Sequence, residues 1–517
     1  MLPTERFIYR MSSIDPERTM DWKENARAML VINSIFFLLG FLILLTQSSH
    51  PFWNPDSIPS MEITTAFNTA ISFMTNTNLQ HYSGETGVSY ASQLLVCCFL
   101  QFVSAGTGIA AMGLIFNGLQ NGSAAQLGNF YVLMVRSCTR ILLPISFVVA
   151  LILVWHGTPS TFEGAATIYT LEGDTVKVAR GPVAPMVAIK QVGTNGGGFF
   201  GPNSTHPFEN PTYVTNAVEN ISILLVPIAL VFAFGYYMRR PRFGYAFFIA
   251  MTVLFVFFCS VAVYLEMNGN PKITRMGIDN TLGNMEGKES RLGAAASAFW
   301  SVSTTSTSNG SVNSMHDSFT PLAGGIFMLD MMINAVYGGV GVGFINFFVF
   351  VVIGVFISGL MVGRTPELFG KKVETREVKI AALVAIAHPF LILVSTAIAA
   401  SVYHDNPSFH GFSEMLYEFT SSAANNGSGF EGLADATPFW NVTCGFVMLL
   451  GRFIPIIGPL AIAGSLASKK YIPESAGTLR VDSIAFNAVL LCVIIIIASL
   501  SFFPALTLGP IAEYFSI

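Results

Sequence analysis

The segment at 193–199 reads GTNGGGF, and an apolar stretch at 183–193 leads into it. A bilayer span needs about twenty apolar residues, so a stretch this short is typical of a buried or re-entrant helix. The same combination of a short apolar stretch and a polar tail occurs three more times. The other stretches cover 62–74, 292–306 and 411–424, and their tails read TNTNLQ at 75–80, TSNGSVN at 307–313 and ANNGSGF at 424–430.

The four tails, named turn 1 to turn 4 in chain order, recur at a near-constant spacing. With Asn78, Asn195, Asn309 and Asn426 as markers, the separations are 117, 114 and 117 residues. A fixed period indicates an internal repeat. Each repeat is then a span, a short re-entrant pore helix, a polar turn and a second span. The alternative is that each tail is an ordinary surface loop, but the period and the preceding apolar stretches favour a repeat.

The composition of the chain indicates a membrane protein. Of its 517 residues 52% are hydrophobic and 11% are charged, with a mean hydropathy of +0.59. Soluble domains carry about 25% charged residues, so this chain is expected to lie in a lipid bilayer and cross it several times. Neither a basic stripe nor an acidic tail is present, which argues against a nucleic-acid partner.

Nine stretches are long and apolar enough to be spans: 28–46, 92–117, 139–155, 217–237, 244–265, 342–362, 379–402, 439–463 and 483–505. The predicted fold class is an all-α polytopic membrane protein with four pseudo-symmetric helix–pore-helix–helix repeats around a central pore. The predicted parts are a cytoplasmic segment at 1–27, repeats at 28–117, 139–237, 244–362 and 379–467, and an extra carboxyl-terminal transmembrane helix at 483–505.

The positions of the basic residues predict the orientation of the chain. If each repeat begins and ends inside the cell, 18 of the 26 Lys and Arg residues lie on or beside inside segments. Seven lie outside, among them Lys190, and Arg452 lies within a span. Because basic residues are retained on the cytoplasmic side, we expect the amino terminus inside and the four turns on the outer side.

The turns have the chemistry of a filter for a dehydrated monovalent cation. Irregular backbone at membrane depth is tolerated only where it is buried or lines a watery cavity, and rings of backbone carbonyls can replace the water shell of an ion. Glycine suits such a turn because it brings no side chain into the lumen. The carboxyl ends of four pore helices would add partial negative charge. The turns contain no Asp or Glu, so an acidic ring for a divalent ion is not supported.

Two other features lie within predicted spans. Arg452 is either a structural anchor for neighbouring carbonyls or a fixed positive charge near the pore, because an unpaired charge at this depth is costly. The segment 330–343 reads DMMINAVYGGVGVG, whose glycines predict a broken helix of the kind found at gates and ion sites. The six cysteines form no CxxC pair and are interpreted as packed thiols. No nucleotide site is evident.

Longer motifs resemble the potassium-binding A subunit of the Kdp-type potassium-transporting ATPase. They are TNTN-Q--SGET at 75–86, GTNGGGFF--NS-HPFENPT at 193–212, NMEGKESR at 284–291, MHDSFT at 315–320, GRTPE--GKK at 363–372, SSAANNGS-F at 421–430 and IAGSL-SKK at 462–470. The resemblance implies a subunit that selects K⁺ in the inner (plasma) membrane of a bacterium. A separate P-type ATPase subunit would supply energy, and a third accessory subunit and a small single-span subunit would complete the assembly.

The resemblance also implies which residues act. The filter would be formed by Thr75, Asn76, Thr77, Asn78, Thr194, Asn195, Gly196, Gly197, Gly198, Ser308, Asn309, Gly310, Ser311, Asn425, Asn426, Gly427 and Ser428. Gln80 and Arg452 match positions below the filter or at its side exit, and the candidates for pore or gate residues are Gln80, Asn334, Gly338, Gly339, Arg364 and Arg452.

The chain departs from the family pattern at three places. Relatives usually begin with one more membrane helix, turn 3 reads Ser308-Asn309-Gly310-Ser311 where relatives often have Cys before the Gly, and Asn334 stands where the best-known relatives carry Glu. A stand-alone potassium channel or symporter of the same superfamily is the alternative function. A membrane protein that serves only assembly is a third.

Overall fold

The computed structural model describes residues 2–50, 52–120, 126–269, 271–363, 365–403, 408–472 and 480–516. Within these residues nine helical stretches are long and apolar enough to cross a membrane, and each coincides with one of the predicted spans. They are Trp22–Ser49, Tyr90–Gln120, Phe130–Trp155, Tyr213–Tyr237, Pro241–Asn268, Val342–Met361, Thr375–Val402, Pro438–Ala467 and Ile484–Ser516.

Four shorter helices occupy the predicted pore-helix positions. They are α3 (Ile63–Met74), α9 (Val183–Val192), α13 (Gly293–Ser306) and α17 (Phe409–Ala424). Each packs between the first and second long helices of its own repeat. The flanking pairs are α2 (Trp22–Thr46) and α6 (Phe99–Gln120), α8 (Leu143–Trp155) and α10 (Tyr213–Tyr237), α11 (Pro241–Asn268) and α14 (Pro321–Ile333), and α16 (Thr375–Val402) and α18 (Pro438–Ala467).

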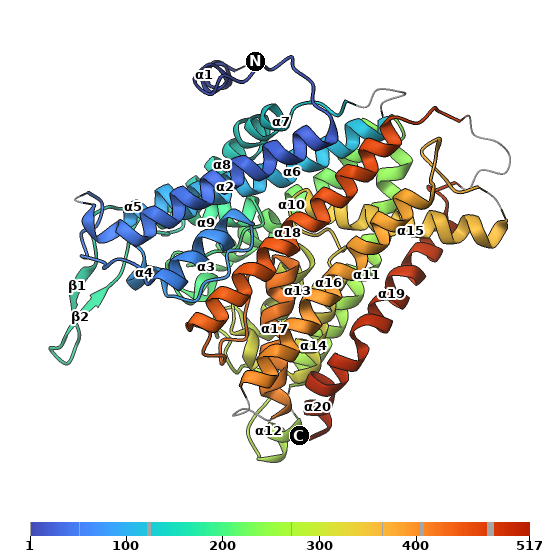
Figure 1. Ribbon diagram of the computed structural model, residues 1–517. Helices are drawn as coiled ribbons and strands as arrows, with labels where there is room; N and C mark the ends of the chain where they lie inside the picture. The colour runs from blue at the N-terminus through green and yellow to red at the C-terminus, as the bar shows by residue number, and fades with distance from the viewer. Residues whose placement is uncertain are drawn as a thin grey trace.

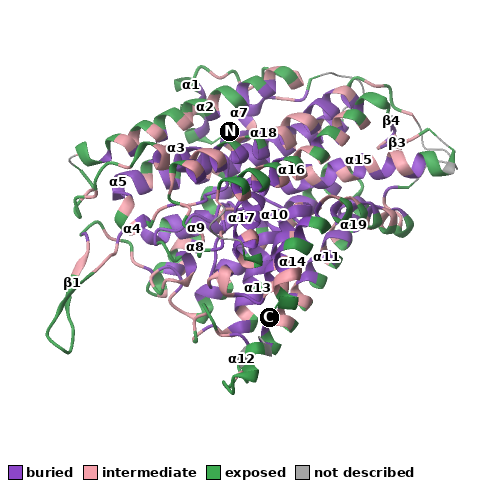
Figure 2. Cartoon of the chain, turned by 60° about the horizontal axis from the view of Figure 1, so that its bottom comes forward, coloured by how far each residue is buried: buried purple, intermediate pink, exposed green. Residues whose placement is uncertain are grey.

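The repeats form a closed ring. The pore helix of each repeat also contacts the second long helix of the repeat before it: α3 packs on α18, α9 on α6, α13 on α10 and α17 on α14. The contact between α3 of the first repeat and α18 of the last closes the circle. All four pore helices are therefore surrounded by protein, and Figure 2 shows buried residues concentrated in this centre while the exposed ones lie on the outward faces of the long helices.

The second long helix of the third repeat is broken, as the glycines of 330–343 predict. Helix α14 ends at Ile333, and α15 (Val342–Val362) begins after eight intervening residues. Asn334 takes a left-handed conformation with φ 48°, which ends α14, and Gly338 and Gly341 also have positive φ. The residues between the two helices, 334–341, are called the broken segment below.

Helix α7 (Phe130–Ser137) extends the second repeat beyond its predicted start at 139, and the short π-helical stretch Cys138–Leu142 joins it to α8. The prediction missed this turn of helix because Arg136 and Arg140 lower its hydropathy. Arg140 is paired: its Nε and Nη2 lie 2.5 and 2.7 Å from the Glu5 carboxylate of α1 (Pro3–Met11). The Arg140 hydrogen bond lowers the pKa of Glu5 to about 2.

The remaining elements lie at the ends of the bundle. A hairpin of β1 (Ala166–Tyr169) and β2 (Thr175–Val178) projects from the second repeat, and the amino and carboxyl termini lie at opposite ends of the molecule (Figure 1). The other elements are the π-helical stretch Gln93–Cys98, the 3₁₀ turns Gln47–Ser49, Asn203–Thr205 and His316–Ser318, α4 (Gly84–Gly87), α5 (Tyr90–Ser92), α12 (Pro271–Arg275), β3 (Glu367–Leu368), β4 (Lys371–Lys372), α19 (Ile484–Leu506), the π-helical stretch Thr507–Ile511 and α20 (Ala512–Ser516).

Candidate cation filter

The four turns share one backbone path. In each, the first and third residues have positive φ while the second does not. The first residues are Asn76, Thr194, Ser308 and Asn425, and the third are Asn78, Gly196, Gly310 and Gly427. Non-glycine residues seldom adopt this conformation, so four equivalent pairs in one chain are not accidental. The repeat inferred from the sequence therefore extends to the geometry of individual residues.

One hydrogen bond corrects the register of the repeat. In every turn the N–H of the second residue donates to the carbonyl five residues earlier, in the last turn of the pore helix, at 2.8–2.9 Å. The donor and acceptor pairs are Thr77 and Ser72, Asn195 and Lys190, Asn309 and Thr304, and Asn426 and Ser421. The marker chosen in turn 1, Asn78, was therefore wrong by one residue. TNTN offers two Asn, and neither occupies the position of the other three markers.

The turns touch one another around a ring. A Cβ added to Gly196 would overlap the carbonyl oxygen of Asn309, one on Gly310 would overlap that of Asn426, and one on Gly427 would overlap that of Thr77. These contacts lead from repeat 2 to 3, from 3 to 4 and from 4 to 1. Glycine is required at these positions because neighbouring backbones meet there and because φ is positive.

Asparagine side chains tie neighbouring turns together. Asn309 Nδ2 donates to the Lys190 carbonyl of repeat 2 (3.0 Å), and Asn426 Nδ2 donates to the Thr304 carbonyl of repeat 3 (2.8 Å). Asn76 Nδ2 donates to the Thr194 carbonyl (2.8 Å), and Asn425 Nδ2 to Thr77 Oγ1 (2.9 Å). All four junctions of the ring are thus bridged. Three of these asparagines bind a backbone carbonyl and Asn425 binds a hydroxyl, and together the four bonds fix the spacing of the turns.

The second residue of each turn contributes a carbonyl oxygen without a partner. Within the described residues, no hydrogen bond is donated to the carbonyls of Thr77, Asn195, Asn309 or Asn426. Nearly all buried backbone carbonyls in proteins are paired with protein or water. Four equivalent unpaired oxygens, one from each repeat, can therefore receive a cation in place of its water shell.

The other predicted filter residues lie around this ring. Thr75 ends α3, and its Oγ1 donates to the Ile71 carbonyl. The N–H groups of Ser311 and Ser428 donate to the side-chain oxygens of Asn309 and Asn426, at 2.8 and 2.9 Å. Gly197 and Gly198 continue turn 2, and their carbonyls accept from the amide groups of Gln101 and Gln80.

Gln80 is the last residue of turn 1 and lies at the far end of the turns, whereas the resemblance implied a position below the filter or at its side exit. Its Nε2 donates to the Gly198 carbonyl (3.0 Å), and its Oε1 accepts from the Gly198 N–H (2.8 Å). Gln80 therefore joins the far ends of turns 1 and 2. The charge distribution predicts that this end faces the outside of the cell.

Arg452 lies at the opposite end of the turns. It is 3% exposed, and its Nη2 donates to the Ser104 carbonyl of α6 (2.9 Å). The Ser104 hydroxyl in turn donates to Asn76 Oδ1 (2.9 Å), so one residue separates the guanidinium from turn 1. Both readings of Arg452 fit this position, since it bonds a neighbouring carbonyl and also brings a positive charge to the base of the turns.

The broken segment lies against the base of turns 2 and 3. The Val340 N–H donates to Thr194 Oγ1 (2.9 Å), and the Gly338 N–H donates to the Ser306 carbonyl (2.7 Å). Ser308 Oγ donates to Asn334 Oδ1 (3.1 Å). A Cβ on Gly339 would lie 3.6 Å from Cβ of Ser308. Three predicted gate residues, Asn334, Gly338 and Gly339, are thus brought to the filter, while Arg364 lies outside the described residues.

A cavity opens beside the broken segment. Its polar lining residues are Asn334, Asn346, His388 and Ser501, and the rest, Pro455 among them, is apolar. The residues come from α14, α15, α16, α18 and α19 as well as from the broken segment. Asn346 Nδ2 donates to the Asn334 carbonyl (3.1 Å), so the cavity and the segment share a wall.

Sequence reasoning missed several polar residues around the turns. Asp330, on α14, accepts hydrogen bonds from Thr305 Oγ1 (2.8 Å) and Ser306 Oγ (2.6 Å) at the end of pore helix α13. Lys190, counted above as an outside charge, is fully buried in α9 and paired with Glu209. Lys190 could have been singled out in the sequence, because it is a basic residue inside a short apolar stretch. No sequence pattern marks Gln101 or Asp330, because the residues that they bind lie outside their own helices.

Comparison with known proteins agrees with this geometry. The family model described as potassium-transporting ATPase A subunit matches residues 1–515. A relative from Flavobacterium psychrophilum, named potassium-transporting ATPase potassium-binding subunit, is 58% identical, with 100% of this chain and 92% of the relative covered. The relative of the same name from Alicyclobacillus acidocaldarius is 49% identical, covering 99% of this chain and 92% of that protein.

A solved structure supports the fold independently. The crystal structure of the potassium transporter TrkH from Vibrio parahaemolyticus superimposes with a TM-score of 0.53 at 14% identity, covering 84% of both chains. An identity this low bears on the fold alone. The nine apolar helices, the ring of pore helices and the family model lead to one conclusion: this chain is a multi-pass membrane protein that belongs to the potassium-transporting ATPase A subunit family.

Proposed function

We propose that this chain is the potassium-binding and translocating subunit of an ATP-driven potassium importer. The observation that carries the proposal is the ring of four unpaired carbonyl oxygens at Thr77, Asn195, Asn309 and Asn426. Close relatives named potassium-binding subunit support the identity of the ion. K⁺ is the transported ion in this proposal and not a resident cofactor.

The filter would favour K⁺ through dipoles. The turns offer backbone carbonyls, and the four pore helices end at the turns, so their carboxyl ends add partial negative charge around the same point. No carboxylate lies in the turn residues themselves. The hydrogen bonds across the four junctions would hold the carbonyls at a spacing that the ion cannot alter.

The broken segment would act as the gate. It lies against turns 2 and 3 through Val340 and Gly338, and it shares a wall with the cavity lined by Asn334, Asn346 and His388. An ion that leaves the filter must pass this segment or turn aside into the cavity. Arg452, beneath turn 1, would oppose the passage of a cation until the segment moves.

Energy would come from a partner chain. Relatives carry the name of a subunit of a potassium-transporting ATPase, and no nucleotide-binding motif is evident in the sequence, so we assign ATP hydrolysis to a separate P-type ATPase subunit. A third accessory subunit and a small single-span subunit complete the proposed complex. We place it in the bacterial inner membrane with the amino terminus inside.

Rubidium uptake tests the proposal against the alternative of a stand-alone channel or symporter. The chain is expressed with and without its pump subunits in a bacterium that lacks other potassium uptake. We expect uptake that requires the pump subunits and ATP. Uptake by the chain alone at a comparable rate would show that it works without a pump. A Gly197→Asp variant with unchanged preference for potassium over rubidium would show that the turns do not select the ion.

A further inference from the structure

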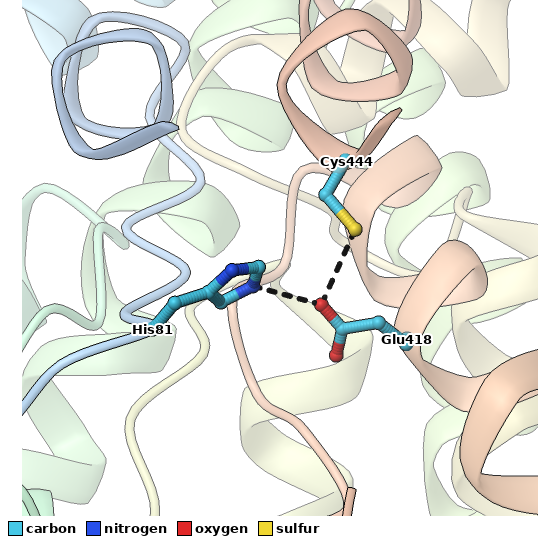
Figure 3. A group of neighbouring side chains, drawn as sticks. All are labelled: His81, Glu418 and Cys444. Carbon is cyan, nitrogen blue, oxygen red and sulfur yellow. Dashed lines mark hydrogen bonds and ion pairs between the residues drawn. The ribbon is translucent and has the colours of Figure 1, made fainter. Parts of the chain in front are cut away.

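Three side chains that the transport proposal does not use meet beside the far ends of turns 1 and 4. His81 follows Gln80 in the loop after α3, Glu418 lies on pore helix α17, and Cys444 lies on α18. All three are buried. Figure 3 shows the imidazole and the thiol directed at the same carboxylate oxygen.

The distances match those between ligands of one metal ion. His81 Nε2 lies 3.1 Å and Cys444 Sγ 3.4 Å from Glu418 Oε1, and all three ligand atoms lie within 4.8 Å of one another. In a tetrahedral zinc site with bonds of about 2.0–2.3 Å, ligand atoms are separated by roughly 3.3–3.7 Å. A metal ion could therefore enter with small side-chain shifts.

A second set of hydrogen bonds orients the imidazole. His81 Nδ1 lies 2.7 Å from Asn441 Oδ1. The Asn441 amide is itself fixed, because its Nδ2 donates to the hydroxyls of Thr64 and Thr65, and both hydroxyls donate to Glu62. Nδ1 thus donates a proton to Asn441, and Nε2 donates one to the Glu418 carboxylate, the position that a metal ion would take. This arrangement, with the other ring nitrogen bonded to an oxygen acceptor, is the one found at histidine metal ligands.

A second carboxylate lies close to the cluster and reaches toward solvent. Asp435 Oδ2 lies 3.9 Å from His81 Nε2, and its side chain is 29% exposed, unlike those of His81 and Glu418. It follows turn 4 in the loop that leads to α18. The donor set of imidazole, thiol and carboxylate is typical of zinc and excludes hard cations such as K⁺ and Mg²⁺.

We propose that His81, Glu418 and Cys444, with Asp435 or water as the fourth ligand, form a binding site for Zn²⁺ or a similar transition-metal ion. The ion replaces the protons that His81 Nε2 and Cys444 Sγ donate to Glu418, and both protons leave to solvent. The bound ion joins the loop after turn 1 to the pore helix of turn 4. Its occupation from outside slows potassium uptake, a consequence that rests on the proposed transport function.

This proposal changes the interpretation of one cysteine. The described cysteines are all free, and Cys444 was expected to be a packed thiol like the others. No metal-binding spacing is visible in the sequence because His81 is 337 residues from Glu418. The closed ring of repeats brings them together, since α3 of the first repeat packs on α18 of the last.

Cobalt spectroscopy on the full chain in lipid nanodiscs tests the binding site. Co²⁺ is added at stoichiometric concentration, and Zn²⁺ is then titrated to displace it. We expect absorption of a tetrahedral Co²⁺ site with a thiolate charge-transfer band. The band should vanish in Cys444→Ser and His81→Ala and persist in Cys259→Ser, which removes a thiol on α11. Asn441→Ala should weaken Zn²⁺ binding by about 10–100-fold, as loss of an outer hydrogen bond does at other metal sites.

No thiolate band in the folded wild-type chain, or an equal band in Cys444→Ser, would overturn the site. Correct folding is checked by unchanged elution of each variant in size-exclusion chromatography. In a separate experiment, external Zn²⁺ should slow rubidium uptake by the wild type and by Cys259→Ser but not by Cys444→Ser. Binding without any change in uptake would refute the effect on transport and leave the potassium filter itself untouched.

Discussion

The ring of turns and the broken segment beneath it differ in how their glycines are packed. In the ring, a Cβ on Gly310 would overlap the backbone of the next turn. In the broken segment, a Cβ on Gly338 or Gly341 would also overlap backbone, but one on Gly339 would meet its nearest atom at 3.6 Å, an ordinary contact. Hydrogen bonds bridge every junction of the ring, and three others, from the Val340 N–H, the Gly338 N–H and Ser308 Oγ, hold the segment beneath turns 2 and 3. We therefore propose that the ring selects the ion and that the gate bends at Gly339, where the backbone has space around it.

Replacement of Gly310 in the ring gives the largest expected effect. Gly310→Ala forces a side chain into the Asn426 carbonyl and a positive φ of 88° on alanine. The conformation alone costs about 1–2 kcal/mol, so rubidium uptake should fall at least about tenfold and potassium selectivity should be lost.

Gly339→Ala is the matched control, since it adds the same methyl group next to the filter, 3.6 Å from Cβ of Ser308. Its uptake should stay within about twofold of wild type. Equal loss in both variants would remove the distinction between the ring and the segment.

Removal of the positive charge beneath the ring should have the second-largest effect. Arg452→Gln keeps a hydrogen-bond donor for the Ser104 carbonyl but removes the repulsion felt by a cation leaving the filter. An interaction of about 1–2 kcal/mol, reasonable for charges some 8–16 Å apart in a medium of ε about 20, predicts a roughly 5–30-fold increase in ATP-independent rubidium leak.

Arg452→Lys retains the charge and should leak little. If Lys leaks as much as Gln, the guanidinium acts as a structural anchor and not through its charge. The leak is measured in proteoliposomes without ATP.

A carboxylate introduced at the broken segment should have a smaller effect of the opposite sign. Asn334→Asp has the same shape and adds a negative charge where Ser308 Oγ already contacts the side chain at 3.1 Å. Because Asn334 is partly exposed, we expect a tightening of potassium affinity of roughly three- to tenfold, or about 1 kcal/mol. Asn334→Ala should not tighten it. Potassium-stimulated ATP hydrolysis of the assembled complex reports both values.

Removal of one hydrogen bond that holds the broken segment should give the smallest change in rubidium leak. Thr194→Val removes the acceptor of the Val340 N–H with little change in volume. One hydrogen bond is worth about 0.5–1.5 kcal/mol, so the leak should rise a few-fold while selectivity is preserved. Loss of selectivity would mean that the segment and the filter are one rigid unit. The ratio of potassium to rubidium uptake distinguishes the two.

Hydropathy and periodicity predicted the architecture well. All nine spans, the four pore helices and the break before α15 are visible in the sequence because each depends on local composition. The start of α7 was missed because Arg136 and Arg140 mask an apolar helix, and Arg140 is tolerated there through Glu5 of another segment. Charge compensation across 135 residues cannot be recognised from one window of sequence.

The candidate site was predicted in part, for a similar reason. Asn and Gly residues identified the turns, but turn 1 was placed one residue too far along, and only the bond from Thr77 to the Ser72 carbonyl revealed it. Gln101 and the His81 cluster depend on partners from other repeats, and Asp330 depends on Thr305 and Ser306, which lie 25 and 24 residues away in its own repeat. Which polar residues meet across the ring is determined by how the repeats close, and the sequence of one repeat does not contain that information.

The ring is tested most directly by a structure of the full chain prepared in rubidium, with anomalous scattering used to locate the ion. We expect a rubidium ion among the carbonyl oxygens of Thr77, Asn195, Asn309 and Asn426, and its loss in Gly310→Ala. An ion bound elsewhere in the wild type, with this ring empty, would show that the four carbonyls are not the binding site.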